Sequence, residues 1–434
     1  MLIEFSVANF RSFKDTVTLS MVAAKLKARD SQLDEDCVVE IDSKLSLLKS
    51  AGIYGPNASG KSNLAAAMAF MKVYVMNSTM GMQTEQPIPV ESFRLCDTTI
   101  DQPSEFEVVF RLEDHKIYRY GFKATTERVV EEWLYFVPSS REAKLFTRKE
   151  DDIEVNSEPN RFREGKGLEH MTRPNALFLS VVNQFNGEVA KKVIKAFLDL
   201  NVITAAMDDT PLLQYTVGWL QDEHLKQNVV RFVGALDLGI RDFQIEEQVI
   251  TSDNIPVGIP TQFREMVLGG TQLDIKTVHR KFGNANHPAG SEEFDLIRNE
   301  SNGTQKLVAL AAPILDSLRS GKVLVVDEID ARLHPLLTRA IIKLFNSRDT
   351  NSSGAQLIFI THDTSLLDAA LLRRDQYWFT EKDHYEASHL YSLAEFKSDT
   401  VRNDSSYDKG YKSGRYGAIP FLGELDEVVC VRHG

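Results

Sequence analysis

Residues 55–62 read Gly-Pro-Asn-Ala-Ser-Gly-Lys-Ser, and this glycine-rich loop constrains the fold more than any other stretch of the chain. It follows an apolar, strand-like run at 47–54 and opens a helix expected at about 61–75, rich in Ala, Met and Leu. Its glycines let backbone N–H groups approach phosphate oxygens, and the helix points its positive N-terminal end at them. Lys61 is expected to bridge the terminal phosphates of a nucleotide, and the Ser62 hydroxyl to bind Mg²⁺. A chance match in an ordinary turn is the alternative, which the strand-loop-helix context disfavours.

Two further apolar runs end in residues that suit phosphate chemistry. Val323–Val326 leads into Asp327 and Glu328, and Leu357–Ile360 leads into Thr361 and His362. Strands that are apolar throughout, alternating with helices at 303–319 and about 335–346, predict a parallel α/β core. Asp327 then suits the Mg²⁺ shell, Glu328 the general base and His362 a sensor of the terminal phosphate. The plainer alternatives are solvated carboxylates at a strand end and a structural histidine.

A third candidate lies at the start of the helix expected at 303–319. Residues 300–306 read Glu-Ser-Asn-Gly-Thr-Gln-Lys, so that Ser301 and Gly303 stand at a helix N-terminus, which can bind a second anion. An ordinary N-cap explains the same residues equally well when they are taken alone.

The rest of the chain shows a mixed organisation. Residues 2–7 and 17–19 read as short strands, and 106–112, 116–122 and 132–137 predict an antiparallel sheet. Residues 150–170 are polar and predict an exposed loop. The pattern turns helical from about 187 to 237, and 241–287 is strand-like and rich in glycine.

Composition narrows the class of protein. The three cysteines, Cys37, Cys96 and Cys430, are far apart and form no CxxC pair, which favours a reducing compartment. No apolar run approaches the length of a membrane span, and residues 1–5 lack a basic leader, so we expect a cytoplasmic protein without a membrane partner. A net charge of −12 lowers the expectation of DNA as an obligatory partner without excluding a local basic patch.

Together these motifs resemble the ATP-binding-cassette (ABC) ATPases, and most closely their SMC, RecF and OLD-nuclease branch. Residues 9–13, Asn-Phe-Arg-Ser-Phe, look like that branch's opening motif near the nucleotide base, and 327–335, Asp-Glu-Ile-Asp-Ala-Arg-Leu-His-Pro, resemble its Walker B and D-loop. Residues 301–305 are similar to its signature, with Asn302 in place of the first glycine. Gln184 is assigned to the Q-loop, with a surface glutamine as the alternative.

The resemblance implies ATP and Mg²⁺ as cofactors and a full set of site residues. Catalytic roles fall to Glu328, His362 and Lys61, and metal binding to Ser62, Asp327 and Gln184. Nucleotide-binding roles fall to Asn9, Arg11, Ser12, Phe13, Gly55, Pro56, Asn57, Ala58, Ser59, Gly60, Lys61, Ser62, Asn63, Ser301, Gly303 and Asp330.

The resemblance also implies an architecture. The expected fold is α/β, an ABC-ATPase head with a mixed, mainly parallel core sheet, an antiparallel β subdomain and a helical lobe that carries the signature. The expected parts are an N-terminal ATPase lobe (1–185), a helical insert lobe (186–300) and a C-terminal ATPase lobe (301–434).

In this branch the signature of one subunit caps the nucleotide on the P-loop of another, so we expect a head-to-tail dimer or higher homo-oligomer. The segment around residues 411–421 resembles the tail of RloA-like and abortive-infection ATPases of bacterial defence operons. That likeness implies an anti-phage role, with a separately encoded effector, a TOPRIM-like nuclease, and a phage protein as trigger. The alternatives are a RecF- or SMC-like ATPase of DNA repair or DNA ends and, less favoured, a transporter subunit.

Overall fold

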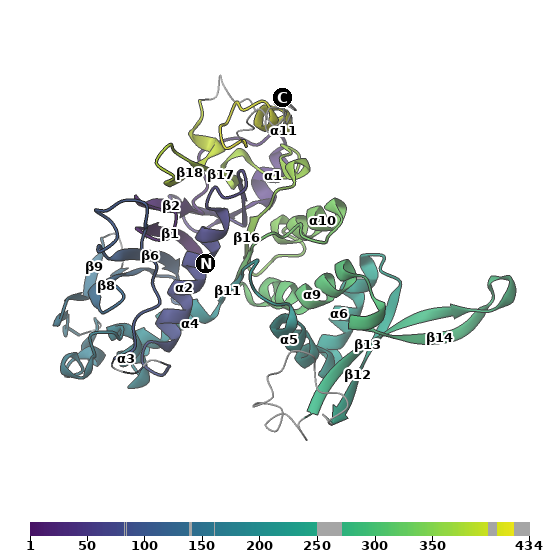
Figure 1. Cartoon of the computed structure of the whole chain (residues 1–434), viewed down its shortest axis with the longest axis horizontal. Coiled ribbons are helices and arrows are strands. Elements are labelled where there is room, and N and C mark those ends of the chain that lie inside the picture. Colours follow the sequence, from purple (N-terminus) through teal and green to yellow (C-terminus); the bar gives the residue numbers. More distant parts are fainter. Residues whose placement is uncertain are drawn as a thin grey trace, which may run out of the picture. The chain divides into compact units, whose positions relative to one another are not determined.

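Figure 1 shows the computed structural model of the 434-residue chain, which describes residues 1–81, 83, 85–138, 141–159, 161–249, 271–397 and 406–420. Cys430 and the last residue of the 411–421 tail, Phe421, lie outside the described residues. The chain forms two compact units. The first comprises Met1–Ala205, Leu318–Asp330 and Thr338–Gly434, and the second Ala206–Ser317 and Ala331–Leu337.

In the part of the chain that the structure describes, the central sheet of the first unit has six strands, in the order β11-β15-β16-β5-β17-β18. Neighbouring strands run parallel except β18, which pairs antiparallel with β17. The strands are β5 (Ser50–Tyr54), β11 (Leu200–Ile203), β15 (Val323–Val326), β16 (Gln356–Ile360), β17 (Tyr377–Lys382) and β18 (Ser388–Ser392). Residues of β5, β15 and β16 are buried throughout, as strands covered on both faces must be. The predicted α/β class is confirmed, and the carboxyl ends of these three strands meet at one edge.

Strand β11 corrects the expectation that 187–237 is helical throughout. Helix α4 (Glu188–Leu198) ends one residue before β11, which pairs in parallel with β15 from Leu200↔Val323 to Ile203↔Val326. Four residues with two buried positions are too short for a periodic signal, and pairing with β15 decides their conformation.

The second sheet of the first unit is antiparallel, in the order β10-β9-β8-β7-β6-β1-β2. Its strands are β1 (Leu2–Ala8), β2 (Val17–Ser20), β6 (Ser104–Arg111), β7 (Ile117–Ala124), β8 (Val129–Val137), β9 (Ala143–Lys149) and β10 (Asp152–Val155). The predicted antiparallel sheet is therefore confirmed. The exposed loop expected at 150–170 is wrong in part: β10 pairs with β9, and the fully buried Phe162 packs against Phe146 and Phe178.

A buried ion pair joins this sheet to the chain that follows it. Glu132 of β8 and Arg148 of β9 are cross-strand partners, with Oε2 and Nη1 3.8 Å apart and both side chains almost fully buried. Glu132 accepts hydrogen bonds from the backbone N–H groups of Phe178 and Leu179 at 2.7 and 3.0 Å. Arg148 donates to the carbonyl of Ala176 at 2.6 Å. The pair thus fixes the start of helix α3 (Phe178–Gln184).

The remaining elements of the first unit cover and connect these sheets. Helix α2 (Lys61–Asn77) packs into the same hydrophobic core as the antiparallel strands, through rings such as Phe70 and Phe106. The elements are α1 (Ser31–Asp36), β3 (Val38–Glu40), β4 (Ser46–Leu48), α2 (Lys61–Asn77), η1 (Arg163–Gly165), η2 (Glu169–Met171), η4 (Thr364–Leu366), η5 (Arg374–Gln376), η6 (Leu393–Glu395) and α11 (Tyr407–Lys412), with most of α10 (Pro335–Asn346).

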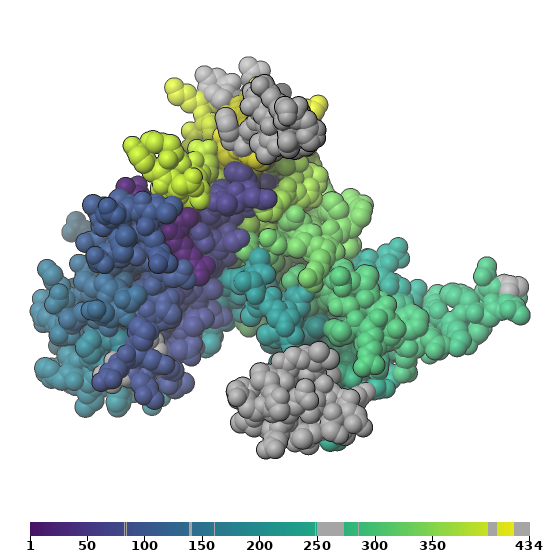
Figure 2. All heavy atoms as spheres, in the orientation of Figure 1, coloured from purple at the N-terminus to yellow at the C-terminus, as the bar shows by residue number. Residues whose placement is uncertain are grey.

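The second unit has a helical core of its own and a β arm. Val217, Val229 and Val308 belong to its buried cluster. Its elements are α5 (Thr210–Gln221), α6 (Glu223–Ala235), β12 (Ile240–Val249), β13 (Thr271–Phe282), η3 (Asn284–Asn286), β14 (Pro288–Asp295), α8 (Leu296–Asn299) and most of α9 (Asn302–Ser320). The strand pattern expected in 241–287 is borne out by β12 and β13 in the described part of that range, and residues 250–270 lie outside the described residues. The arm projects from the helices of its unit, and β14 is exposed along most of its length (Figure 2). Within the described residues, every helix is too short or too polar to cross a membrane.

Candidate functional site

The glycine-rich loop connects the end of β5 to the start of α2, as the sequence predicts. Its backbone is left-handed at Ala58 (φ +62°) and at Gly60 (φ +104°), the residue before the helix. A Cβ on Gly60 would lie 2.8 Å from the Ser12 Oγ and would also meet the Ser388 Oγ. Glycine is therefore required at position 60 both by its φ angle and by the close approach of two hydroxyl groups.

We expect Gly60→Ala to lower the free energy of unfolding by more than the roughly 1–2 kcal/mol of left-handed strain alone. Gly167→Ala is the matched control, because Gly167 also has a left-handed φ (+91°) but has open space where a Cβ would stand. Urea unfolding of both variants measures the difference. Equal losses of unfolding free energy in the two variants would show that the close contact with Ser12 and Ser388 does not contribute to the effect of Gly60→Ala.

Lys61 is almost fully buried at the first position of α2. Its Nζ donates hydrogen bonds to the carbonyl oxygens of Gly55 and Pro56, both at 2.8 Å. Burial lowers the pKa of Lys61 to about 8, and the nearby carboxylates of Asp327 and Glu328 oppose that shift. The ammonium group is thus held inside the loop, within electrostatic range of two carboxylates.

This lowered pKa predicts a pH dependence of stability without nucleotide. The unfolded chain holds the Lys61 proton up to about pH 10.5, whereas the folded chain releases it near pH 8. Stability therefore rises with pH between these values. We expect the free energy of unfolding of the wild type, minus that of Lys61→Met, to be flat below about pH 8 and to increase toward pH 10.5. Urea unfolding at each pH measures this difference. A difference that falls or stays flat between about pH 8 and 10.5 would contradict the lowered pKa of Lys61.

Asp327 and Glu328 follow β15 directly and differ in exposure. Asp327 is buried; its Oδ2 accepts a hydrogen bond from the Ala205 N–H at 3.3 Å, and its Oδ1 has no partner among the described residues. A buried carboxylate oxygen without a partner is a position that a cation or a bound water can fill. Glu328 is exposed and has a left-handed φ of +53°, an unusual conformation for a residue with a side chain. Ser62 is also exposed, at the second position of α2.

His362 follows β16 and is accessible to solvent. Partial burial and the positive charge of Lys61 lower its pKa, while Asp330, Glu328 and Asp327 act in the opposite direction. The same charges therefore act on both Lys61 and His362, which places these side chains within electrostatic reach of one another. A neutral imidazole at pH 7 can donate one hydrogen bond and accept another.

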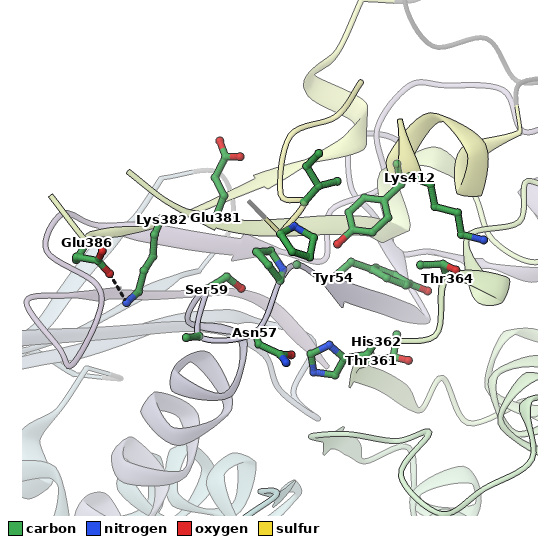
Figure 3. A pocket seen from close by; sticks show the side chains of 16 residues that line it. Tyr54, Asn57, Ser59, Thr361, His362, Thr364, Glu381, Lys382, Glu386 and Lys412 are labelled. Atoms are coloured by element: carbon green, nitrogen blue, oxygen red, sulfur yellow. Dashed lines mark hydrogen bonds and ion pairs between the residues drawn. The ribbon is translucent and has the colours of Figure 1, made fainter. Parts of the chain in front are cut away.

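A cavity of about 800 Å³ opens in front of the loop. Gly55–Ser59, Thr361 and His362 line one part of it, and Figure 3 shows Asn57 and His362 close to each other at its edge. Other side chains also line it: Glu381, Lys382 and Glu386 from the end of β17 and the turn after it, and Tyr411, Lys412, Ile419 and Pro420 from the 411–421 segment. The sequence predicts a place beside the loop for none of them, because they reach it only through the packing of β17, β18 and the chain near the C-terminus. A cavity of this size suits a small-molecule ligand.

Asn9 and Phe13, the two ends of the motif at residues 9–13, do not have the nucleotide-binding role that the sequence predicts for them. The Asn9 side chain is used within the fold: Nδ2 donates to the carbonyls of Thr99 and Gln102, and Oδ1 accepts from the Phe93 N–H. Phe13 is fully buried in the core, so neither residue is available to a ligand.

The other two residues of this motif lie nearer the surface. The Ser12 hydroxyl accepts a hydrogen bond from Asn63 Nδ2 at 2.7 Å and therefore touches the first turn of α2. Arg11 forms a half-exposed ion pair with Glu91 at 3.0 Å. The motif thus supports the glycine-rich loop chiefly through Ser12.

Ser301 and Gly303 belong to the second unit, at the start of α9. Ser301 caps this helix, since its Oγ accepts a hydrogen bond from the Thr304 N–H at 3.2 Å, yet it remains exposed. A Cβ on Gly303 would lie 2.6 Å from the carbonyl oxygen of Arg332. Asp209 holds the same two segments together, because it accepts from Lys306 at 2.7 Å and from Arg332 at 3.4 Å. The start of α9 is thus an exposed helix N-terminus fastened to the chain after Asp330.

Gln184 does not reach the glycine-rich loop, which corrects its assignment as a metal ligand. It is exposed at the end of α3, and α3 contacts the far part of α2, where the Ser180 Oγ donates to the Val75 carbonyl at 2.7 Å. Val75 lies about 21 Å along the helix from Lys61, at 1.5 Å per residue. One further turn of α3 cannot span that distance.

Comparison with known proteins identifies the family. Residues 50–184 and 269–368, more than half of the chain, match the family described as "AAA domain, putative AbiEii toxin, Type IV TA system". No curated protein matches the chain.

Several solved structures align with the chain over most of its length. They include the SMC head domain from Thermotoga maritima (14% identity, 90% of this chain and 98% of that chain, TM-score 0.40). An SMC head bound to the C-winged helix domain of ScpA aligns at 13% identity, over 92% of this chain and 99% of that chain, with a TM-score of 0.42. The recombination mediator protein RecF aligns at 15% identity, over 90% of this chain and 98% of that chain, with a TM-score of 0.38. These likenesses are weak, so the family assignment rests on the sequence match and on the glycine-rich loop. The chain belongs to the AAA-domain family that the matching description names.

Proposed function

We propose that the chain binds ATP with Mg²⁺ and hydrolyses it to ADP and phosphate. The observation that carries this proposal is the meeting of Lys61, Asp327, Glu328 and His362 at the carboxyl ends of β5, β15 and β16, where their charges act on one another. Backbone N–H groups of the loop and Lys61 would hold the phosphates. Glu328, exposed at the strand end, would orient and deprotonate the attacking water, and His362 would hydrogen-bond the terminal phosphate.

Asp327 and Ser62 are the residues that would hold Mg²⁺. The unpartnered, buried Oδ1 of Asp327 and the exposed hydroxyl of Ser62 are oxygen donors of the kind that this ion prefers. The metal would neutralise phosphate charge as the terminal phosphoryl group leaves.

We further propose that two copies of the chain share the nucleotide. Ser301 is exposed at the N-terminus of α9, and the helix dipole there favours an anion. Its hydroxyl and the Gly303 backbone would contact the terminal phosphate bound to a second copy, and Asp330 would lie near this interface. Each nucleotide would then be held by the N-terminus of α2 from one copy and the N-terminus of α9 from the other. This arrangement predicts an assembly that closes on ATP and reopens after hydrolysis.

The assembly is expected to change mass with nucleotide. In Glu328→Gln, which blocks turnover, ATP should raise the mass measured by light scattering from that of one chain to that of two or more. Lys61→Met is the control, since it removes the phosphate-binding ammonium group and should show no ATP-dependent change. An unchanged mass in Glu328→Gln with saturating ATP would contradict the shared site.

As a biological role we propose that this ATPase acts in the cytoplasm as a sensor and scaffold in anti-phage defence and restrains a separate nuclease effector until a phage protein triggers release. The support is the family description, which refers to an AbiEii toxin and a type IV toxin–antitoxin system, together with the resemblance of the tail. Co-purification with the product of the neighbouring gene, with and without ATP, tests the role. DNA-stimulated, strongly salt-dependent ATPase activity without such a partner would favour the DNA-repair alternative.

A further inference from the structure

Residues 406–420, hereafter the strap, bring a segment near the C-terminus onto the sheet that carries the glycine-rich loop. The strap consists of α11 and the turn after it, and Figure 1 shows it beside β17 and β18. Tyr411 stacks on Phe379 of β17, with centroids 5.5 Å apart and planes at 14°, and Tyr416 packs on the same ring. Tyr416 is almost fully buried. The strap is therefore packed as part of the core of its unit.

Hydrogen bonds fix the path of the strap as well. The Tyr391 hydroxyl of β18 donates to the Tyr416 carbonyl at 2.7 Å, and the Ala418 N–H donates to Glu381 Oε2 at 2.8 Å. Within the strap, the Tyr411 hydroxyl donates to the Ala418 carbonyl at 2.7 Å.

Strand β17 contacts the strap and the glycine-rich loop with alternate residues. Phe379 and Glu381 contact the strap, whereas the Thr380 Oγ1 lies 2.6 Å from the Ser59 Oγ of the loop. Successive side chains of a strand point to opposite faces, so β17 contacts the strap with one face and the glycine-rich loop with the other. A shift of the loop would therefore be transmitted to the surface on which the strap packs.

The strap also forms a wall of the 800 Å³ cavity. Tyr411, Lys412, Ile419 and Pro420 line it together with Asn57 and His362, and Figure 3 shows Lys412 and His362 on different sides of the pocket. Tyr54, at the end of β5, also lines this cavity; it is 1% exposed, and its hydroxyl has no hydrogen-bond partner among the described residues. A buried hydroxyl without a partner beside a cavity is a group that a bound ligand or its water shell can satisfy.

We propose that the strap is part of the nucleotide site: it forms one wall of the cavity that the glycine-rich loop and His362 also line, and it slows the release of the nucleotide held by the loop. This inference rests on the proposed ATP binding, and it adds that the strap lengthens the time for which the nucleotide stays bound. Nucleotide leaving the loop on the side of the strap must pass the wall made by Tyr411, Ile419 and Pro420. Detaching the strap opens that side while Lys61 and the loop keep their own contacts.

The test uses the full chain and a double variant, Glu381→Ala with Tyr391→Phe, which removes the two hydrogen bonds that anchor the strap to β17 and β18. Hydrogen exchange of 407–416 reports docking, and stopped-flow displacement of a fluorescent ATP analogue reports release. We expect faster exchange and a release rate about tenfold higher, as the combined loss of two hydrogen bonds, each at the low end of the usual contribution, implies. Tyr385→Ala, which removes an exposed ring in the β17–β18 turn, is the control and should change neither rate.

The outcomes separate the two proposals. If the double variant leaves the strap protected, Tyr416→Ala removes the buried ring and is measured in the same way. A detached strap with an unchanged release rate overturns the inference while the proposed function stands. If the wild type binds the analogue no better than Lys61→Met, the proposed function fails, and the inference fails with it.

Discussion

Glu328→Gln is expected to lower the rate of ATP hydrolysis by about a hundred- to ten-thousandfold, the range over which a positioned general base contributes. The amide has the same shape as the carboxylate but cannot accept a proton from the attacking water. Glu328 is exposed, so the substitution should leave the fold and the affinity for ATP unchanged. Phosphate release at saturating ATP measures the rate, and equilibrium binding of a labelled nucleotide measures the affinity.

The hydrolysis experiment on Glu328→Gln needs a control for the loss of one negative charge. Glu105→Gln, on β6 of the antiparallel sheet, serves as the control for loss of one negative charge and should hydrolyse ATP at the wild-type rate. If Glu328→Gln kept more than about a tenth of the wild-type rate, a loss far below that of a removed general base, the role of Glu328 would be wrong.

Glu132→Ala is expected to destabilise the first unit by about 3–5 kcal/mol, which is typical when one partner of a buried ion pair is removed. The variant leaves Arg148 buried without its carboxylate and leaves the N–H groups of Phe178 and Leu179 without their acceptor. Burial raises the pKa of Glu132, and the positive charge of Arg148 opposes this shift. The ionised form of Glu132 therefore depends on its pairing with Arg148. The midpoint of urea unfolding reports the loss.

The neighbouring residue gives a matched comparison. Glu131 lies on the same strand, with a partly exposed side chain 3.2 Å from Lys123, and an exposed pair of this kind contributes roughly 0–1 kcal/mol. Glu131→Ala should therefore shift the unfolding midpoint little. Similar shifts for the two variants would show that burial of the Glu132–Arg148 pair does not determine its effect.

The parts that the sequence predicted well are those whose signal is local. The loop at 55–62, the apolar strands ending at Val326 and Ile360, and the helix at 303–319 each combine an apolar pattern with a chemical motif, and the structure has each in its expected place. Their meeting at one sheet edge follows from parallel pairing, which a run of apolar strands and helices already implies.

The parts that the sequence did not reveal depend on contacts between distant segments. Strand β11 is recognisable only by its pairing with β15, and the buried Phe162 only by its contacts with Phe146 and Phe178. Asn9 belongs to a motif that suggests nucleotide contact, yet its side chain is hydrogen-bonded to the 93–103 segment. The 411–421 segment stands out in the sequence only by its resemblance to a family tail, which does not predict that Tyr411 and Tyr416 pack on β17. In each instance tertiary packing determines a role that local propensity does not encode.

In the proposed assembly each nucleotide lies between the glycine-rich loop of one copy and the start of α9 of another. Mixing two inactive variants tests it directly. Lys61→Met disables the loop, and Ser301→Asp places a carboxylate against the phosphate while keeping an N-cap, because Asp caps helices as well as Ser does. Ser301→Asn, a neutral cap, is the control for the added charge.

With a shared site, each variant alone should hydrolyse no ATP. Their equimolar mixture should recover about a quarter of the wild-type rate, since half of randomly formed symmetric dimers are mixed and one of the two sites in each is intact. A mixture as inactive as its components, or a Ser301→Asp variant that alone keeps the wild-type rate, would contradict the shared site.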